Sequence, residues 1–159
     1  MSTYFWSSLS NGQTINPFNP SADTLYFDAL AISAADLFIA WDTGQTLVRF
    51  QYGVKIVAVV TSPLTITSTN VTFANGSLLL AGDNMATVGA DNAANTLVGA
   101  SGNDQLLGFG GGDELHGGDG ADHLMGGAAG DLLDGGSGGR YCGLSGFTGW
   151  CFGQPSHER

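Results

Sequence analysis

The chain has 159 residues and carries 14 acidic side chains against four lysines and arginines, a formal net charge of −10 at pH 7. This length fits one ordinary domain or two small ones and argues against a large enzyme with a deep core. The acidic balance argues against a surface that follows nucleic-acid phosphates and favours cations as partners. No apolar run approaches the roughly 20 residues of a membrane helix, so no membrane span is predicted.

Glycine usage divides the chain. Residues 1–98 contain 6 glycines, whereas residues 99–139 contain 16. We therefore expect three parts: a small β-rich domain at residues 1–89, a glycine-rich repeat at residues 90–139, and an irregular tail at residues 140–159. Residues 1–11 show neither the basic nor the apolar segment of a standard secretory signal peptide.

Residues 1–89 are expected to form a small antiparallel β domain, because short β-branched and aromatic runs alternate with turn signals. Residues 33–36 favour one capped helical turn. Asn75-Gly76 is a hairpin signal between residues 71–73 and 78–80. The expected strands are residues 24–27, 37–41, 46–50, 54–60 and 64–67.

The aromatic residues of this domain have two interpretations. Most are expected in a hydrophobic core, but some could form a face on which a carbohydrate stacks. The residues concerned are Phe5, Trp6, Tyr26, Phe27, Phe38, Trp41, Phe50 and Tyr52.

Residues 99–134 repeat with a period of nine residues in four copies, which begin at Gly99, Gly108, Gly117 and Gly126. The sixth position is aspartate in every copy, and the eighth is leucine. The aspartates are Asp104, Asp113, Asp122 and Asp131, and the leucines are Leu106, Leu115, Leu124 and Leu133. Strand alternation predicts that the leucines face inward and form a narrow core.

Glycines at the first, second and fourth positions allow positive φ and close approach of the backbone, so that carbonyl oxygens can point at a cation. A cage of carboxylate and carbonyl oxygens suits calcium, whereas zinc prefers Cys or His and magnesium prefers a stricter octahedron. The candidate glycines of the metal site are Gly102, Gly108, Gly110, Gly111, Gly117, Gly118, Gly120, Gly126 and Gly127.

These repeats resemble the RTX, or haemolysin-type, nonapeptide repeat Gly-Gly-x-Gly-x-Asp-x-U-x, in which U is a large apolar residue. The resemblance implies a short right-handed parallel β-roll, a β-solenoid with two nonapeptides per turn and calcium between turns. It implies that Asp104 shares an ion with Asp122 and Asp113 with Asp131. We expect two or three ions in all. Residues 90–98 look like a degenerate first layer, because Leu97 is kept but Asn95 replaces the aspartate.

A metal-free solenoid whose aspartates only cap turns stays open as an alternative. Against it, residues 99–139 hold seven carboxylates and no lysine or arginine. Stacked aspartates would repel one another without a cation, so we expect calcium-coupled folding.

The pattern breaks at Arg140, which stands where the next aspartate is expected, and a frameshifted or truncated end would explain the change. Cys142 and Cys151 could form a disulfide or, with His157, a weak metal site. His116 and His123 occupy variable repeat positions and are expected to face solvent rather than to act as ligands.

The leading hypothesis is a non-enzymatic calcium-binding module of a secreted or surface bacterial protein, which the resemblance associates with type I secretion. Residues 1–98 contain no His or Cys and no nucleophile elbow, P-loop or zinc-protease motif. The alternatives are an adhesion or surface-assembly module that binds carbohydrate or neighbouring subunits, and the remnant of a secreted hydrolase or cytolysin.

Overall fold

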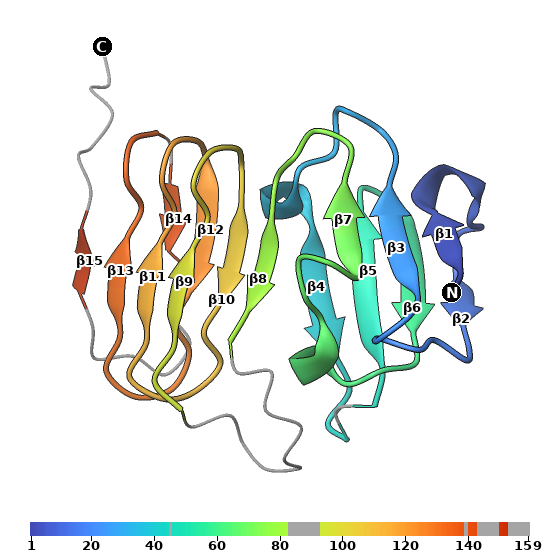
Figure 1. Cartoon of the computed structure of the whole chain (residues 1–159), viewed down its shortest axis with the longest axis horizontal. Coiled ribbons are helices and arrows are strands. Elements are labelled where there is room, and N and C mark those ends of the chain that lie inside the picture. The colour runs from blue at the N-terminus through green and yellow to red at the C-terminus, as the bar shows by residue number, and fades with distance from the viewer. Residues whose placement is uncertain (45, 83–92, 139, 143–149, 153–159) are drawn as a thin grey trace.

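The computed structural model describes residues 1–44, 46–82, 93–138, 140–142 and 150–152 (Figure 1). This part of the chain is all-β, with three single 3₁₀ turns, η1 (Trp6–Ser8), η2 (Ala34–Asp36) and η3 (Pro63–Thr65). Among the described residues, no helix has the length and apolar character that crossing a membrane requires.

The N-terminal region contains two sheets with a shared core. In the first, strands β1 (Thr3–Phe5), β3 (Thr24–Phe27) and β7 (Val71–Phe73) are parallel. The second has the order β2 (Gln13–Ile15), β6 (Lys55–Val59), β5 (Val48–Tyr52) and β4 (Phe38–Trp41). Large buried side chains of both sheets form one cluster, which includes Leu25, Phe27, Val48, Phe50, Val57, Val71 and Phe73.

The expected antiparallel pairing is correct for only part of this region. Strands β4, β5 and β6 are antiparallel, whereas β2 is parallel to β6 and the first sheet is parallel throughout. Local sequence identifies strand-forming runs but not their partners, and the long connections here allow parallel pairing.

Two local expectations need correction and one is confirmed. Residues 63–65 form η3 instead of part of a strand. Asn75-Gly76 forms a turn, but β7 pairs with β3 and the following strand pairs elsewhere, so there is no hairpin. The Asn75 side chain accepts a hydrogen bond from Ser77 N–H at 3.1 Å and donates one to Ser33 Oγ at 2.8 Å. The capped turn is confirmed as η2, where Ser33 and Asp36 form a capping box.

The repeat region contains two further sheets, and consecutive strands along the chain alternate between them (Figure 1). One sheet contains β8 (Leu79–Ala81), β10 (Gln105–Leu107), β12 (Asp122–Met125) and β14 (Arg140–Cys142). The other contains β9 (Thr96–Val98), β11 (Glu114–His116), β13 (Leu132–Asp134) and β15 (Trp150–Phe152). All pairs are parallel, and Leu106 pairs with Leu124 and Leu115 with Leu133, one 18-residue turn apart.

The four repeat leucines are completely buried between these two sheets, as strand alternation predicts. Leu80 and Leu97, from the first turn, pack against them. This core is one leucine wide, so each layer depends on contacts with its neighbours.

Strand pairing extends beyond the glycine-rich segment at both ends. Upstream, β8 pairs with β10 although it lies before the expected boundary at residue 89. Downstream, β14 and β15 continue the two sheets inside the expected irregular tail, which corrects that expectation for these six residues. The proposed roles of Cys142, Cys151 and His157 lie outside the described side chains.

The N-terminal region packs directly against the first repeat turn, and β8 lies between the two regions (Figure 1). Leu79 and Leu107 belong to the N-terminal core cluster rather than to the leucine column. Ala35 N–H donates to Asn103 C=O at 3.2 Å. Leu79 of β8 and Leu107 of β10 are therefore covered by the N-terminal region.

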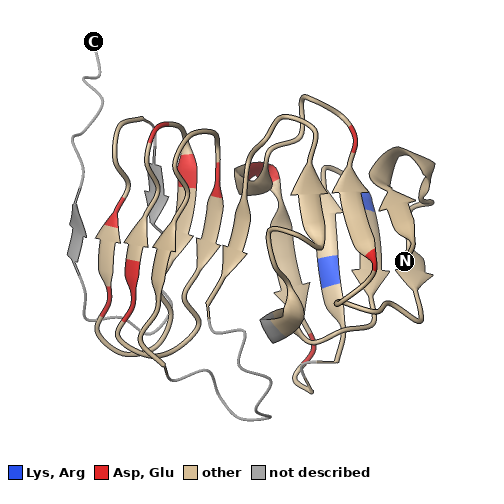
Figure 2. Ribbon diagram, in the orientation of Figure 1, with Lys and Arg blue, Asp and Glu red and all other residues tan. Residues whose placement is uncertain are grey.

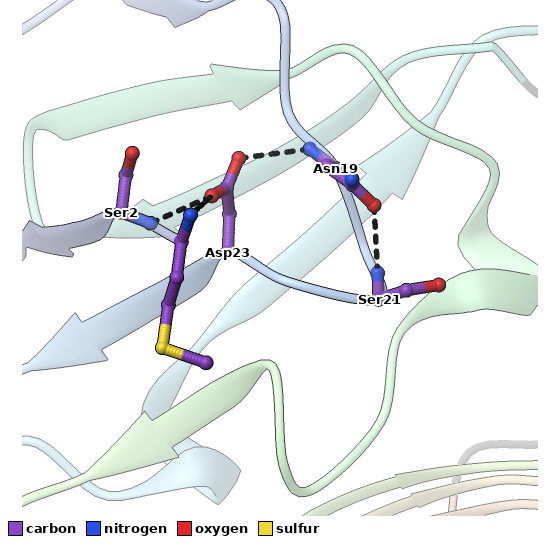
Figure 3. A network of polar contacts seen from close by, with 5 residues as sticks. Ser2, Asn19, Ser21 and Asp23 are labelled. Carbon is purple, nitrogen blue, oxygen red and sulfur yellow. Dashed lines mark hydrogen bonds and ion pairs between the residues drawn. The ribbon is translucent and has the colours of Figure 1, made fainter.

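The N-terminus itself is fixed by Asp23, immediately before β3 (Figure 3). Its carboxylate accepts hydrogen bonds from Asn19 N–H at 3.0 Å and Ser2 N–H at 2.7 Å, with the Met1 ammonium 4.0 Å away. The hydrogen bond from the Asn19 backbone is the largest cause that holds the pKa of Asp23 below its ordinary value. This network holds β1 beside β3.

Candidate metal centre

The four position-six aspartates form two columns, one on each sheet. In the first column, Leu78 N–H donates to Asp104 Oδ1 at 2.7 Å, and Asp104 N–H donates to Asp122 Oδ1 at 2.9 Å. Each carboxylate thus accepts a hydrogen bond from the backbone one turn earlier. The structure therefore brings Asp104 and Asp122 together, the pair that the resemblance implies.

The second column repeats this arrangement. Asn95 N–H donates to Asp113 Oδ1 at 2.9 Å, and Asp113 N–H donates to Asp131 Oδ1 at 3.0 Å. The contribution of Leu78 was missed in the sequence, because Leu78 is not acidic and precedes the glycine-rich segment. Asn95 was identified at the aspartate position of the degenerate first layer, 18 residues before Asp113, but not as a backbone donor.

The second oxygen, Oδ2, of each aspartate is buried. For Asp104 and Asp131, no described residue donates a hydrogen bond to it. A buried carboxylate oxygen without a donor carries a desolvation cost that a cation could offset. These orphaned acceptors are the first feature that fits a metal ion.

The first glycine of each repeat provides space beside that oxygen. A Cβ added to Gly108 would lie 2.5 Å from both Asp113 Oδ2 and the carbonyl oxygen of Gly126, which is one turn later. A Cβ on Gly99 would lie 2.6 Å from Asp104 Oδ2 and 2.5 Å from Gly117 O. A carboxylate and a carbonyl oxygen therefore converge on a cradle that any larger residue would fill.

Positions two and four of the repeats have positive φ throughout. The glycines there are Gly102, Gly111, Gly118, Gly120 and Gly127, and three repeats place Ala100, Phe109 and Ala129 at equivalent positions with φ of 77°, 67° and 90°. The fold therefore imposes a left-handed backbone even where the sequence departs from glycine, at a cost in strain. Gly110 differs, because it lies at position three and forms a parallel bridge with Ala128.

The electrostatic environment also favours a cation. Burial, followed by the charge of Asp122, raises the pKa of Asp104 to about 6, although the Leu78 N–H opposes this shift. Figure 2 shows acidic residues at and beside the strand ends of the repeat, whereas the basic residues coloured there lie on β5 and β6. Residues 99–139 hold seven carboxylates and no lysine or arginine, and Arg140 on β14 pairs in register with Asp122.

Side chains alone do not make a complete metal site. In the described ranges, no group of three or more His, Cys, Asp or Glu residues lies close enough to hold an ion. Each column supplies two carboxylates, so backbone carbonyls must provide the remaining ligands. Such an all-oxygen set suits a hard cation that takes six to eight oxygens, as calcium does.

The two repeat histidines lie outside the aspartate columns. His116 Nε2 lies 3.0 Å from Glu114 Oε1, and its Nδ1 lies 3.7 Å from Asp134 Oδ2. His123 Nδ1 lies 3.4 Å from Gln105 Nε2, and burial lowers the pKa of His123. Both side chains are partly exposed to solvent and lie beside side chains of adjacent strands.

Comparison with known proteins agrees with this geometry. A family model of the RTX calcium-binding nonapeptide repeat, four copies long, matches residues 89–124 and 107–140. No curated protein and no solved structure matches the chain. The matched residues contain both aspartate columns and the four buried leucines. Residues 89–140 therefore match the RTX calcium-binding nonapeptide repeat.

Proposed function

We propose that this chain binds calcium through its glycine–aspartate repeats and that calcium binding is coupled to folding of the repeat region. The observation that carries the proposal is the buried Oδ2 of Asp104 and Asp131, which accepts no hydrogen bond from the described residues. RTX nonapeptide repeats are calcium-binding repeats, and the family match covers both residues.

The proposed ligands form two groups, one at each aspartate column. Asp104 and Asp122 would hold an ion at one edge, and Asp113 and Asp131 at the other, with turn carbonyls such as that of Gly126 completing each set. Calcium, when bound, supplies positive charge that offsets the buried carboxylates. We expect two or three ions in all.

The proposed architecture is a short parallel β-roll. Its support is the 18-residue register between paired strands and their alternation between two sheets. We keep the division into a β-rich domain at residues 1–89, a repeat at residues 90–139 and a tail at residues 140–159. Strand β8 lies within residues 1–89, but it pairs with β10 of the repeat.

Folding of the repeat should depend on the cation, because the leucine core is narrow and the carboxylates around it are unbalanced. Asp104 and Asp122 lie close enough for the charge of one to raise the pKa of the other. A site of this kind hardly exists in the unfolded chain, so its binding free energy adds to the free energy of folding.

RTX repeats point to a secreted or surface protein of a bacterium, and we propose that setting for this chain. The proposed role is binding rather than catalysis. An adhesion module is the second candidate, and it is favoured by two exposed aromatic side chains, Phe5 (46% exposed) and Phe38 (66%). Retention on carbohydrate columns that Phe5→Ala abolishes would support adhesion over a purely calcium-binding role.

Isothermal titration calorimetry tests the proposal, with calcium titrated into the chain after a chelator has removed bound metal. We expect two or three calcium ions per chain, and Asp113→Asn should remove at least one of them. Asp134→Asn is the matched control, because Asp134 lies at position nine and outside both columns. Equal calcium binding by the two variants would contradict the proposed ligand set.

A further inference from the structure

Phe109 is the most unusual residue of the repeat region. It occupies position two of the second repeat, where the repeat pattern has glycine, and its φ is 67°. A bulky side chain rarely adopts this backbone conformation without compensation from its surroundings. The compensation should lie in contacts that the side chain makes.

Those contacts join the repeat to the N-terminal region. The Phe109 ring packs edge-on against Trp41 at the end of β4, with centroids 5.4 Å apart and planes at 71°. Both rings are partly buried against the main hydrophobic core. An aromatic pair in this geometry contributes stabilisation beyond the area that it buries.

The backbone of Phe109 lies next to the candidate calcium site. The preceding residue, Gly108, faces Asp113 Oδ2 and the carbonyl of Gly126. The carbonyl of Phe109 accepts a hydrogen bond from Ala128 N–H, in the next turn, at 2.8 Å. The ring of Phe109 therefore touches one region of the protein while its backbone forms part of the other.

We infer that Phe109 and Trp41 are positioning residues for the calcium site of Asp113 and Asp131, and that they couple calcium binding to the N-terminal β region. This inference rests on the proposed function. When calcium orders the turn around Gly108, it fixes the Phe109 ring against Trp41. This contact then reduces local unfolding of β4. Because coupling between two equilibria is reciprocal, the same contact raises calcium affinity at this site.

The preceding repeat provides a matched control. Ala100 also occupies position two and has a φ of 77°, but it is exposed and carries no ring. Ala100→Gly removes the same kind of backbone strain without breaking a contact with Trp41. Phe109→Gly removes both the strain and the contact.

Hydrogen–deuterium exchange of the full chain, with and without calcium, tests the inference at peptide level. In the native chain, calcium should slow exchange in residues 38–52 as well as in residues 113–134. Phe109→Gly should abolish the effect in residues 38–52, keep it in residues 113–134, and raise the calcium midpoint there roughly threefold to tenfold. Ala100→Gly should behave like the native chain, and Phe109→Tyr, which retains the ring, should restore coupling.

Each other outcome is decisive. Protection of residues 113–134 without protection of residues 38–52 in the native chain would overturn the coupling and leave calcium binding intact. Protection of residues 38–52 that persists in Phe109→Gly would show that the coupling does not pass through this ring. No calcium effect on any peptide would overturn the proposed function itself.

Discussion

The two regions of this molecule bury apolar surface in different ways. The N-terminal core is wide and contains aromatic stacks, in which Phe27 packs on Trp6 at 4.6 Å and on Phe73 at 4.8 Å. The repeat core is a single column of four leucines with buried carboxylates at its edges.

This difference affects how each region can be stable. The polar groups near the N-terminal core have donors within the protein, as Asp23 shows with two backbone N–H groups. In the repeat, Asp104 Oδ2 and Asp131 Oδ2 have none among the described residues. The first region can therefore be stable on its own contacts, whereas we expect the second to depend on a cation and on its neighbour.

The largest expected effect is in the N-terminal core. Phe27→Ala should lower the free energy of unfolding by about 3–5 kcal/mol, because Phe27 is completely buried and its removal leaves a cavity. The loss should be similar with and without calcium, as measured by urea unfolding followed by tryptophan fluorescence. Phe38→Ala is the control, and its change should stay within about 0.5 kcal/mol because Phe38 is exposed. A calcium dependence of the Phe27→Ala effect larger than the coupling expected through Phe109 and Trp41 would show that the N-terminal region is not stable on its own contacts.

A cavity in the leucine column should behave differently. Leu115→Ala should cost about 2–5 kcal/mol in the calcium-loaded repeat and should shift calcium-induced folding to higher calcium concentration. Far-UV circular dichroism during a calcium titration measures this shift. Leu132→Ala provides the comparison, because the partly exposed Leu132 lies outside the column. If both variants fold at the same calcium concentration as the native chain, calcium does not act by stabilising the leucine column.

Asp104→Asn should raise the free energy of unfolding in the absence of calcium and lower it in the presence of calcium. Without calcium, it removes a buried charge beside Asp122, and its Oδ1 can still accept from Leu78 N–H, so stability should rise by about 1–3 kcal/mol. With calcium at about a thousand times the Kd, the bound ion contributes roughly 4.1 kcal/mol, and losing this ligand should therefore outweigh the gain. Thermal unfolding in chelator and in calcium measures both signs. A change of the same sign in both conditions would contradict the assignment of Asp104 as a ligand.

The smallest expected effect concerns backbone strain. Ala129→Gly should stabilise the repeat by about 0.5–1 kcal/mol, because Ala129 has a φ of 90° that glycine adopts more readily. Gly130→Ala, the adjacent change, meets no atom within 4 Å and should not lower stability. Chemical denaturation in saturating calcium compares the two. Destabilisation by Ala129→Gly would mean that the strain is offset by a contact of its methyl group.

Much of the repeat was predictable because its period is encoded directly in the sequence. Asp104, Asp113, Asp122 and Asp131 recur every nine residues, and the same spacing places the four leucines inward. The strand at residues 24–27 was also predicted correctly, because its β-branched and aromatic composition is a local signal.

The pairing of strands was less predictable. Asn75-Gly76 specifies a turn but not whether the flanking strands pair with each other, and tertiary contacts send β7 and β8 to different sheets. The inclusion of β8, β14 and β15 in the repeat sheets was missed because these strands lack the glycine–aspartate pattern. Their partners supply the register, which cannot be derived from composition.

The roles of Phe109 and Trp41 could not be predicted for a related reason. In the sequence, Phe109 is a departure from the repeat pattern, and Trp41 is one aromatic residue among several in the N-terminal region. Only their proximity in the structure gives that departure a function.

The most direct test of the central claim is far-UV circular dichroism of the chelated chain during a calcium titration, with magnesium as the control. The N-terminal region should give a β signal at the start, and calcium should add further β signal that magnesium does not reproduce. Asp113→Asn should weaken that gain. A spectrum that is complete in chelator and indifferent to calcium would contradict calcium-coupled folding and favour a metal-free solenoid.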